Sequence, residues 1–316
     1  MSGAGAPPHG PAPADPIPIG EVAAPPFVRR PQPQEMFAER AERFAALAAG
    51  HDLGPYLSLL AEVARAQHVL AGALPVPEWP PADAMVRAYE FGMPPLDRNR
   101  LVPDAAFAAA LRRLPDLLDG AAMPEAARAA LAGVRDAGDG GRAAMARNLL
   151  EDAVPAEAFA EHAFAAAALQ VDFARRAERL DAARLRPVTE AAAGTGTLCP
   201  ACGAPPVASL IVGWEGAHGS RFCACWLCGT LWNHVRIKCT LCGPTGGIAY
   251  QALDGGAGTV RAETCDTCRG YVKILSQHTD TALDPVADDV ATLGLDLLLR
   301  DAGFSRGAFN PFLVGY

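Results

Sequence analysis

Cysteine spacing is the clearest chemical signal in this sequence of 316 residues. Eight of the nine cysteines form four Cys-x-x-Cys pairs, which are Cys199/Cys202, Cys225/Cys228, Cys239/Cys242 and Cys265/Cys268. Each cysteine of the first two pairs has a counterpart 40 residues later, in the last two pairs. A fixed repeat of this kind indicates two tandem copies of one small unit.

Four thiols in each copy favour a metal site. A segment of roughly 40 residues buries too little apolar surface to fold alone, and a metal held by four thiolates supplies the missing free energy. Because a duplication should carry one whole site per copy, we expect Cys199, Cys202, Cys225 and Cys228 to form one site and Cys239, Cys242, Cys265 and Cys268 the other. The alternative grouping would join the first pair to the third.

The identity of the metal stays open, because iron and zinc both accept four thiolates in a tetrahedron. Closed coordination leaves no position for a substrate, which argues against hydrolysis or Lewis-acid catalysis. A disulfide framework is disfavoured because no secretory segment is visible. A dithiol redox centre is disfavoured because no βαβ pattern accompanies the motif.

A glycine directly after the second cysteine suits the positive φ that such a turn tends to need. Gly203, Gly229 and Gly243 occupy this place in three of the pairs. In the fourth pair the residue is Arg269, which predicts an altered geometry and a less stable second site.

Three further residues near the pairs could ligate a metal. The ninth cysteine, Cys223, would share a strand face with Cys225, and we expect it to be a small buried apolar side chain rather than an alternative ligand. His218 and His234 are also expected to stay outside the sites, because each copy already has four cysteines.

Composition narrows the class of protein. Apolar residues make up 51% of the chain, as in globular proteins. The net charge of −8 argues against a protein-wide nucleic-acid surface. No apolar run reaches the roughly 18 residues of a membrane span, and no export signal is visible. We therefore expect a cytoplasmic protein without membrane insertion.

The first part of the chain predicts helices. A Pro- and Ala-rich leader, residues 1–30, is expected to be flexible. An all-helical domain follows over residues 31–190, with helices from about residue 33 and over 54–72, 82–91, 104–118, 123–136, 140–152 and 156–185. Its isolated histidines lack a paired nucleophile or carboxylate, so we expect a docking surface rather than a catalytic site.

The second part predicts short strands around the cysteines. Residues 197–238 form the first four-cysteine module, with strands over 207–212, 221–225 and 231–238, and residues 239–278 form the second, with strands over 248–253, 260–264 and 271–275. Without a spacer between them, the modules should be rigidly coupled. Residues 279–316 should hold a helix over 285–302 and an apolar tail that packs on the body. The fold class is α+β and multidomain.

The chain resembles the formate dehydrogenase accessory proteins of the FdhE family from about residue 30 to its end. The resemblance lies in the four cysteine pairs, Cys199–Gly203, Val235–Cys239, Tyr271–Leu275, Val286–Asp289 and Asn310–Leu313. It implies two tandem rubredoxin-like modules with iron at the eight paired cysteines. It also implies a non-enzymatic role in the cytoplasm, which is the maturation of a formate dehydrogenase by binding its catalytic subunit.

Two other functions remain to be weighed. A zinc-ribbon nucleic-acid-binding protein is the first alternative, but residues 199–278 carry an excess of only two positive charges. A thiol oxidoreductase is weaker still. Self-association stays open.

Overall fold

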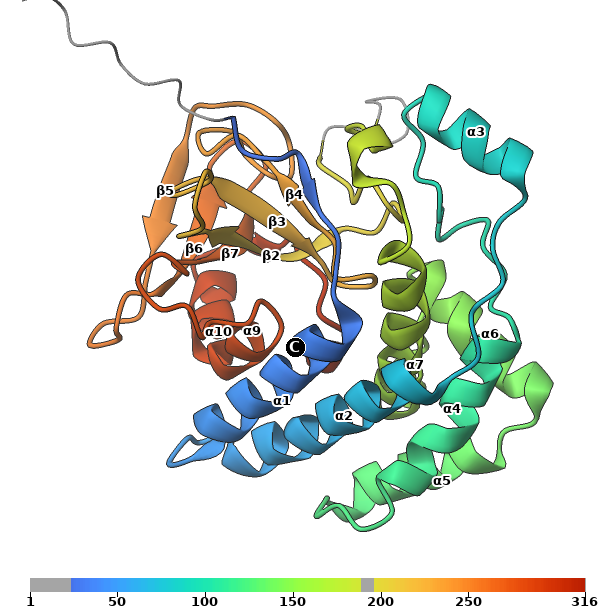
Figure 1. Ribbon diagram of the computed structural model, residues 1–316. Coiled ribbons are helices and arrows are strands. Elements are labelled where there is room, and N and C mark those ends of the chain that lie inside the picture. The colour runs from blue at the N-terminus through green and yellow to red at the C-terminus, as the bar shows by residue number, and fades with distance from the viewer. Residues whose placement is uncertain (1–23, 189–195, 316) are drawn as a thin grey trace, which may run out of the picture.

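The computed structural model describes residues 24–188 and 196–315. Helices fill most of the first range, and an eight-stranded sheet dominates the second (Figure 1). The predicted leader lies largely outside the described residues. Among the described residues no helix combines the length and apolar character needed to cross a bilayer.

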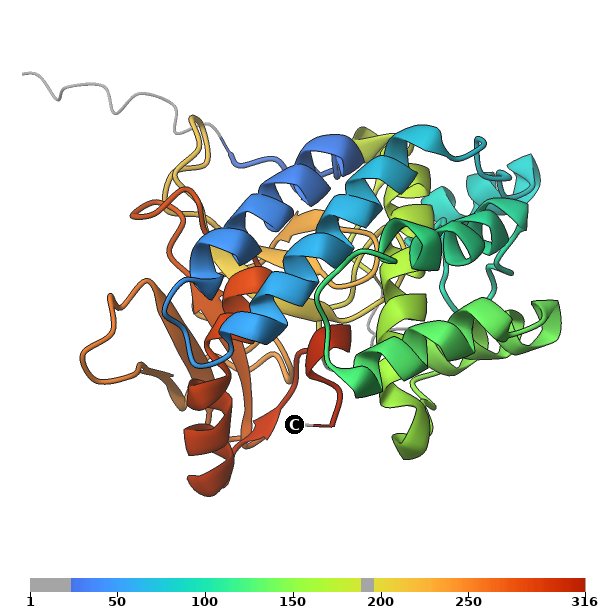
Figure 2. The same cartoon turned by 90° about the horizontal axis from the view of Figure 1, so that it is seen from below.

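The helical half is organised around one buried helix. Its members are α1 (Pro33–Ala48), α2 (Gly54–Ala73), α3 (Ala82–Glu90), α4 (Ala105–Leu117), α5 (Glu125–Asp136), α6 (Asp139–Leu150) and α7 (Phe159–Ala177). α7 contacts α1, α2, α4, α5 and α6, and it is buried on nearly every side, which its alanine-rich sequence permits. Figure 2 shows α1 and α2 running side by side across the molecule.

The strands form one sheet. They are β1 (Val28–Arg29), β2 (Pro206–Ile211), β3 (Arg221–Cys225), β4 (Leu231–Asn233), β5 (Ile248–Gln251), β6 (Val260–Cys265), β7 (Gly270–Leu275) and β8 (Ser305–Arg306). Their order is β1-β4-β3-β2-β7-β6-β5, with β8 beside β7. The two cysteine-containing copies meet where β2 and β7 pair in parallel, with Ser209 opposite Ile274. This shared sheet is the physical coupling between them.

One hydrophobic core joins the helices to the first copy. The same cluster of buried residues includes Leu169 of α7 and Trp226 of the first copy. Gln170 donates from Nε2 to the carbonyl of Trp226 at 2.8 Å. The loop after α3 adds two backbone bonds, from the N–H of Leu96 to Ala201 O (2.9 Å) and from the N–H of Arg98 to Cys202 O (3.0 Å). The first copy is therefore packed into the body of the protein.

Two predicted helices are shorter or broken. The helix over 156–185 is α7 alone, flanked by the 3-10 turns Ala156–Ala158 and Ala182–Arg184. The helix over 285–302 is divided at Thr292 into α9 (Ala287–Ala291) and α10 (Leu293–Asp301). Lys273 explains the break, because its Nζ donates to the carbonyls of Asp289 (2.7 Å) and Thr292 (3.1 Å).

Two strand predictions also need correction. The strand over 231–238 ends at Asn233, and the N–H of Lys238 instead closes a turn on Val235 O at 3.2 Å. Residues Val28–Arg29, assigned to the flexible leader, form β1 and pair with β4. A strand of two residues has no periodicity to reveal it, and its partner lies some 200 residues further along the chain.

The chain end lies against the helices. Asn310 accepts the N–H of Phe312 through its side chain at 3.1 Å and begins a 3-10 turn over Pro311–Leu313. Tyr56 donates its hydroxyl to Phe312 O at 2.7 Å. All three residues of the turn are buried, and the turn contacts α7.

Candidate metal centres

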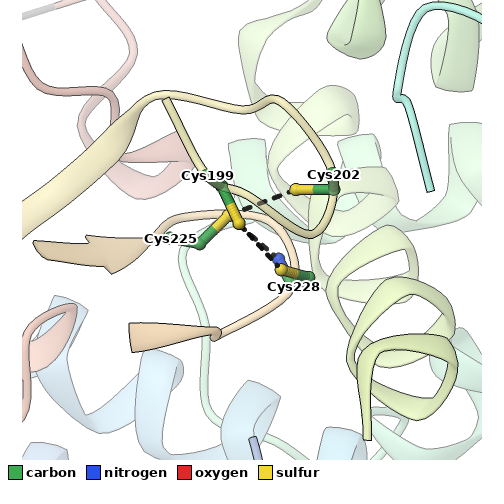
Figure 3. A group of neighbouring side chains, drawn as sticks. All are labelled: Cys199, Cys202, Cys225 and Cys228. Carbon is green, nitrogen blue, oxygen red and sulfur yellow. Dashed lines mark hydrogen bonds between the residues drawn. The ribbon is translucent and has the colours of Figure 1, made fainter. Parts of the chain in front are cut away.

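The first four cysteines converge on one point. We call Cys199, Cys202, Cys225 and Cys228 the first centre. Figure 3 shows their sulfurs facing one another from two turns, one before β2 and one between β3 and β4. Sγ distances are 3.6 Å for Cys199–Cys228 and 3.4 Å for Cys202–Cys225. Thiolates at about 2.3 Å from a central metal would be about 3.8 Å apart, so the arrangement fits a tetrahedral ion.

Backbone geometry explains the convergence. Gly203 has a φ of +74° and Gly229 a φ of +72°, as the glycine placement predicts. Each of these glycines donates its N–H back to the first cysteine of its pair, to Cys199 O at 2.8 Å and to Cys225 O at 3.3 Å. In each pair the tight turn directs both cysteine side chains to the same side.

Burial makes the first centre unfavourable without a cation. All four sulfur-bearing residues are buried. Burial raises the pKa of the Cys199 thiol well above its ordinary value, and it raises the pKa of Cys202 in the same way. Four thiolates cannot coexist in such a place unless a positive ion compensates them, and soft thiolate donors suit zinc or iron.

The second centre consists of Cys239, Cys242, Cys265 and Cys268. Its Sγ distances are 3.9 Å for Cys239–Cys268 and 3.7 Å for Cys242–Cys265. In both centres the four ligand atoms lie within 4.8 Å of one another, so each group can hold a metal ion. The grouping within each copy is as predicted, and the interleaved alternative is wrong. Here, however, Cys268 is exposed and Cys242 half-buried.

Arg269 takes the glycine position without disrupting the turn. Its φ is +54°, in the left-handed region where Gly203 and Gly229 lie. The guanidinium stacks 3.9 Å from the ring centroid of Phe304 and donates to Ala302 O at 3.0 Å. These contacts offset the strain of a residue other than glycine at positive φ. The altered turn geometry that the sequence predicted is therefore absent from the backbone.

The three neighbouring candidates lie outside both centres. Cys223 is fully buried, with its Sγ 3.7 Å from Ser209 Oγ, and burial raises its pKa. Burial and then the charge of Arg221 lower the pKa of His234 to about 4, so it stays neutral near pH 7. The ring of His218 lies edge-on to that of His278, with the ring centroids 6.2 Å apart. None of them belongs to either group of four.

Sequence reasoning missed the group that connects the two centres. Arg221 is buried and bonds to both carboxylate oxygens of Glu263, at 2.8 and 3.0 Å. It also donates to the carbonyl of Lys238 (3.3 Å) and to the hydroxyl of Thr240, which lies between two cysteines of the second centre. The signal was present as an arginine within an apolar strand, but its partner could not be read from spacing.

A second buried network fixes the end of the chain and was also missed. Lys273 lies 3.2 Å from Asp289 and 2.5 Å from Asp296, and Arg306 pairs with the same two carboxylates. Asn310 donates to Asp289 at 2.8 Å. Two cations and two anions balance in charge, which makes their burial tolerable. A lysine in the middle of the apolar strand Tyr271–Leu275 was the available signal.

The fold and its cysteine groups define a class, a helical protein fused to paired four-cysteine centres. Sequence models of the FdhE family match it in three parts: "FdhE, N-terminal" over residues 25–190, "FdhE, central domain" over 198–236 and "FdhE, C-terminal domain" over 237–313. Together they span most of the described residues. The chain belongs to the FdhE family.

Individual relatives agree with the family models. The chain is 45% identical over 308 residues to "Protein FdhE homolog" of Rhizobium meliloti (strain 1021), covering 97% of this chain and 99% of that protein. It is 32% identical over 288 residues to "Protein FdhE" of Escherichia coli (strain SMS-3-5 / SECEC), covering 90% of this chain and 89% of that protein. The crystal structure of the FdhE protein from Pseudomonas aeruginosa superposes with a TM-score of 0.81 at 35% identity, covering 92% of this chain and 99% of that chain.

Proposed function

We propose that this protein is a non-enzymatic assembly factor that matures a formate dehydrogenase by binding its catalytic subunit. Membership of the FdhE family supports the role in maturation. The two four-cysteine groups support a role without catalysis. Four thiolates complete a tetrahedron, so a bound metal has no free position for a substrate. The first centre is also buried beneath the loop that contains Leu96.

The eight paired cysteines are the proposed metal ligands, with iron at both centres. Sulfur spacing fits iron and zinc alike, so the choice of iron rests on the family. Either metal would supply folding free energy by holding two chain segments together. Iron would in addition allow a one-electron change at each centre.

The cytoplasm is the proposed location. None of the nine cysteines, all of which lie in the described residues, forms a disulfide, and cysteines stay unoxidised where the compartment is reducing. A catalytic subunit would meet this factor there during its assembly.

Binding to the catalytic subunit is the decisive test. The full-length chain, purified without oxygen, is immobilised with its metals and again after their removal, and the purified catalytic subunit of a formate dehydrogenase is passed over both. We expect specific, saturable binding to the metal-loaded form. If neither form binds the subunit, the proposed function is wrong.

Metal content is measured on the same preparation. Close to two irons per chain, one for each cysteine group, with ferric-thiolate absorption after oxidation, would support iron. Two zincs per chain in a colourless protein would show that the metals are structural zinc rather than iron. The binding experiment with the catalytic subunit would then decide the proposed role.

A further inference from the structure

The sheet has a free edge next to the second centre. β5 is the last strand in the order and pairs with β6, and no strand among residues 24–188 and 196–315 covers its other side. Figure 1 shows β5 on the outside of the molecule, on the side opposite α3–α7. An uncovered edge offers backbone N–H and C=O groups to an incoming extended chain.

Exposed apolar side chains accompany this edge. Val235, Ile237 and Tyr250 keep 53%, 66% and 46% of their surface exposed. The segment with Val235 and Ile237 is brought near β5 by the buried Arg221–Glu263 pair: Arg221 holds the carbonyl of Lys238, and Tyr250 donates its hydroxyl to Glu263 at 3.3 Å. The segment that contains Val235 and Ile237 and the strand β5 are therefore both hydrogen-bonded to the Arg221–Glu263 ion pair.

Positive charge surrounds the apolar groups. Arg236, Lys238 and Arg261 are exposed, and no carboxylate in the described parts of the chain lies within ion-pair distance of them. Arg261 lies 5.8 Å from the ring centroid of Tyr250. The whole chain has a net charge of −8, so this surface is opposite in sign to its surroundings. We call Val235, Arg236, Ile237, Lys238, Tyr250 and Arg261 the β5 edge patch.

We propose that the β5 edge patch binds an extended, acidic segment of the formate dehydrogenase catalytic subunit, which joins the sheet as a strand beside β5. The inference rests on the proposed function and names the surface that performs it. Carboxylates of the segment pair with the three cations, and apolar residues between them cover Ile237 and Tyr250. Charged residues on an edge often serve only to prevent aggregation, but exposed apolar side chains would work against that purpose.

The edge strand β5 lies close to the second centre, so a segment bound there would lie near that centre. Ile248 of β5 stands opposite Cys265 of β6, a ligand of the second centre. A strand added to β5 is thus separated from this centre by one strand. The proposed contact lies next to the more exposed of the two metal positions.

Charge reversal tests the contact with the purified catalytic subunit and the full-length, metal-loaded chain. The triple variant Arg236→Glu/Lys238→Glu/Arg261→Glu should bind roughly tenfold more weakly, equivalent to about 1.4 kcal/mol. Its affinity should also depend less steeply on salt. The matched control is Arg128→Glu, an exposed arginine on α5 that should bind as the wild type does. Unchanged metal content and melting temperature show that the variants are folded.

Two further measurements define the mode of binding. Ile237→Asp should weaken binding, whereas Val102→Asp, at a side chain 80% exposed elsewhere, should not. Amide hydrogen exchange of residues 248–251 should slow when the subunit is bound, because an added strand protects the edge. Weaker binding of the triple variant without this protection would overturn strand addition.

The remaining outcomes separate this inference from the proposed function. Wild-type binding that the triple variant retains in full would overturn the inference alone. No wild-type binding would overturn the proposed function and the inference with it. Salt-dependent binding of a DNA or RNA oligonucleotide that the triple variant loses would assign the patch to nucleic acid and overturn the peptide contact.

Discussion

The two four-cysteine centres have the same spacing but very different surroundings. The first centre is fully buried, lies in the main hydrophobic core and is hydrogen-bonded to the helical half. The second stands near the outer end of the sheet, with one cysteine exposed and one half-buried. Repeated cysteine spacing therefore brings four sulfurs together in each copy, while the chain outside the repeat decides how deeply each group is buried.

The loss of a ligand should separate the centres most strongly. Cys202→Ser in the first centre should abolish cooperative folding, because a structural thiolate metal contributes on the order of 10–16 kcal/mol and a whole domain is stable by only about 5–15 kcal/mol. Cys242→Ser in the second centre should keep the helical half and one metal per chain. Thermal melts by circular dichroism and metal analysis measure both. Equal losses in the two variants would remove the distinction between a core centre and a peripheral one.

The link between the centres should produce the next largest effect. Arg221→Met leaves the Glu263 carboxylate buried without its partner, which should cost about 3–5 kcal/mol in the free energy of unfolding. Its repeat counterpart, Arg261→Met, is exposed and should change stability by less than about 0.5 kcal/mol. Urea titration of both variants gives the comparison.

A double variant shows whether the loss of stability in Arg221→Met comes from the unpaired, buried carboxylate of Glu263. Arg221→Met/Glu263→Gln should recover part of the loss, because the glutamine carries no charge. A double variant less stable than Arg221→Met alone would contradict this account.

The centre whose cysteines are more exposed should release its metal first. With a chelator in excess, the second centre should lose its metal first, because Cys268 and Cys242 are open to the competing ligand while the first centre must wait for local opening of the core. Native mass spectrometry should show a transient species with one metal. Alkylation mapped by mass spectrometry should label Cys268 and Cys242 before Cys199. Simultaneous loss of both metals would indicate that the centres open as a unit.

Local chemistry made the centres predictable from sequence. The grouping of the cysteines follows from the repeat, and the positive φ at Gly203 and Gly229 follows from a turn that only a few residues build. Such features depend on neighbours in the chain.

Long-range contacts were not predictable in the same way. The division of the predicted C-terminal helix depends on Lys273 reaching the carbonyls of Asp289 and Thr292 from another element. Arg221 and Arg261 hold the same place in the repeat, yet one is buried and the other exposed, because the Arg221 side chain reaches Glu263 of the second copy, whereas Arg261 pairs with no carboxylate among the described residues. A pattern that repeats in sequence cannot show which copy acquires a neighbour.

The smallest expected effect concerns the one turn that lacks its glycine. Arg269→Gly relieves the left-handed strain but loses the stack on Phe304 and the bond to Ala302 O, so stability should change by less than about 1 kcal/mol. Arg269→Ala loses the same contacts and keeps the strain, so it should be less stable than the glycine variant by about 1–2 kcal/mol. Chemical denaturation of the metal-loaded variants measures the difference. If alanine and glycine behave alike, the positive φ costs nothing here, and exposure alone distinguishes the second centre from the first.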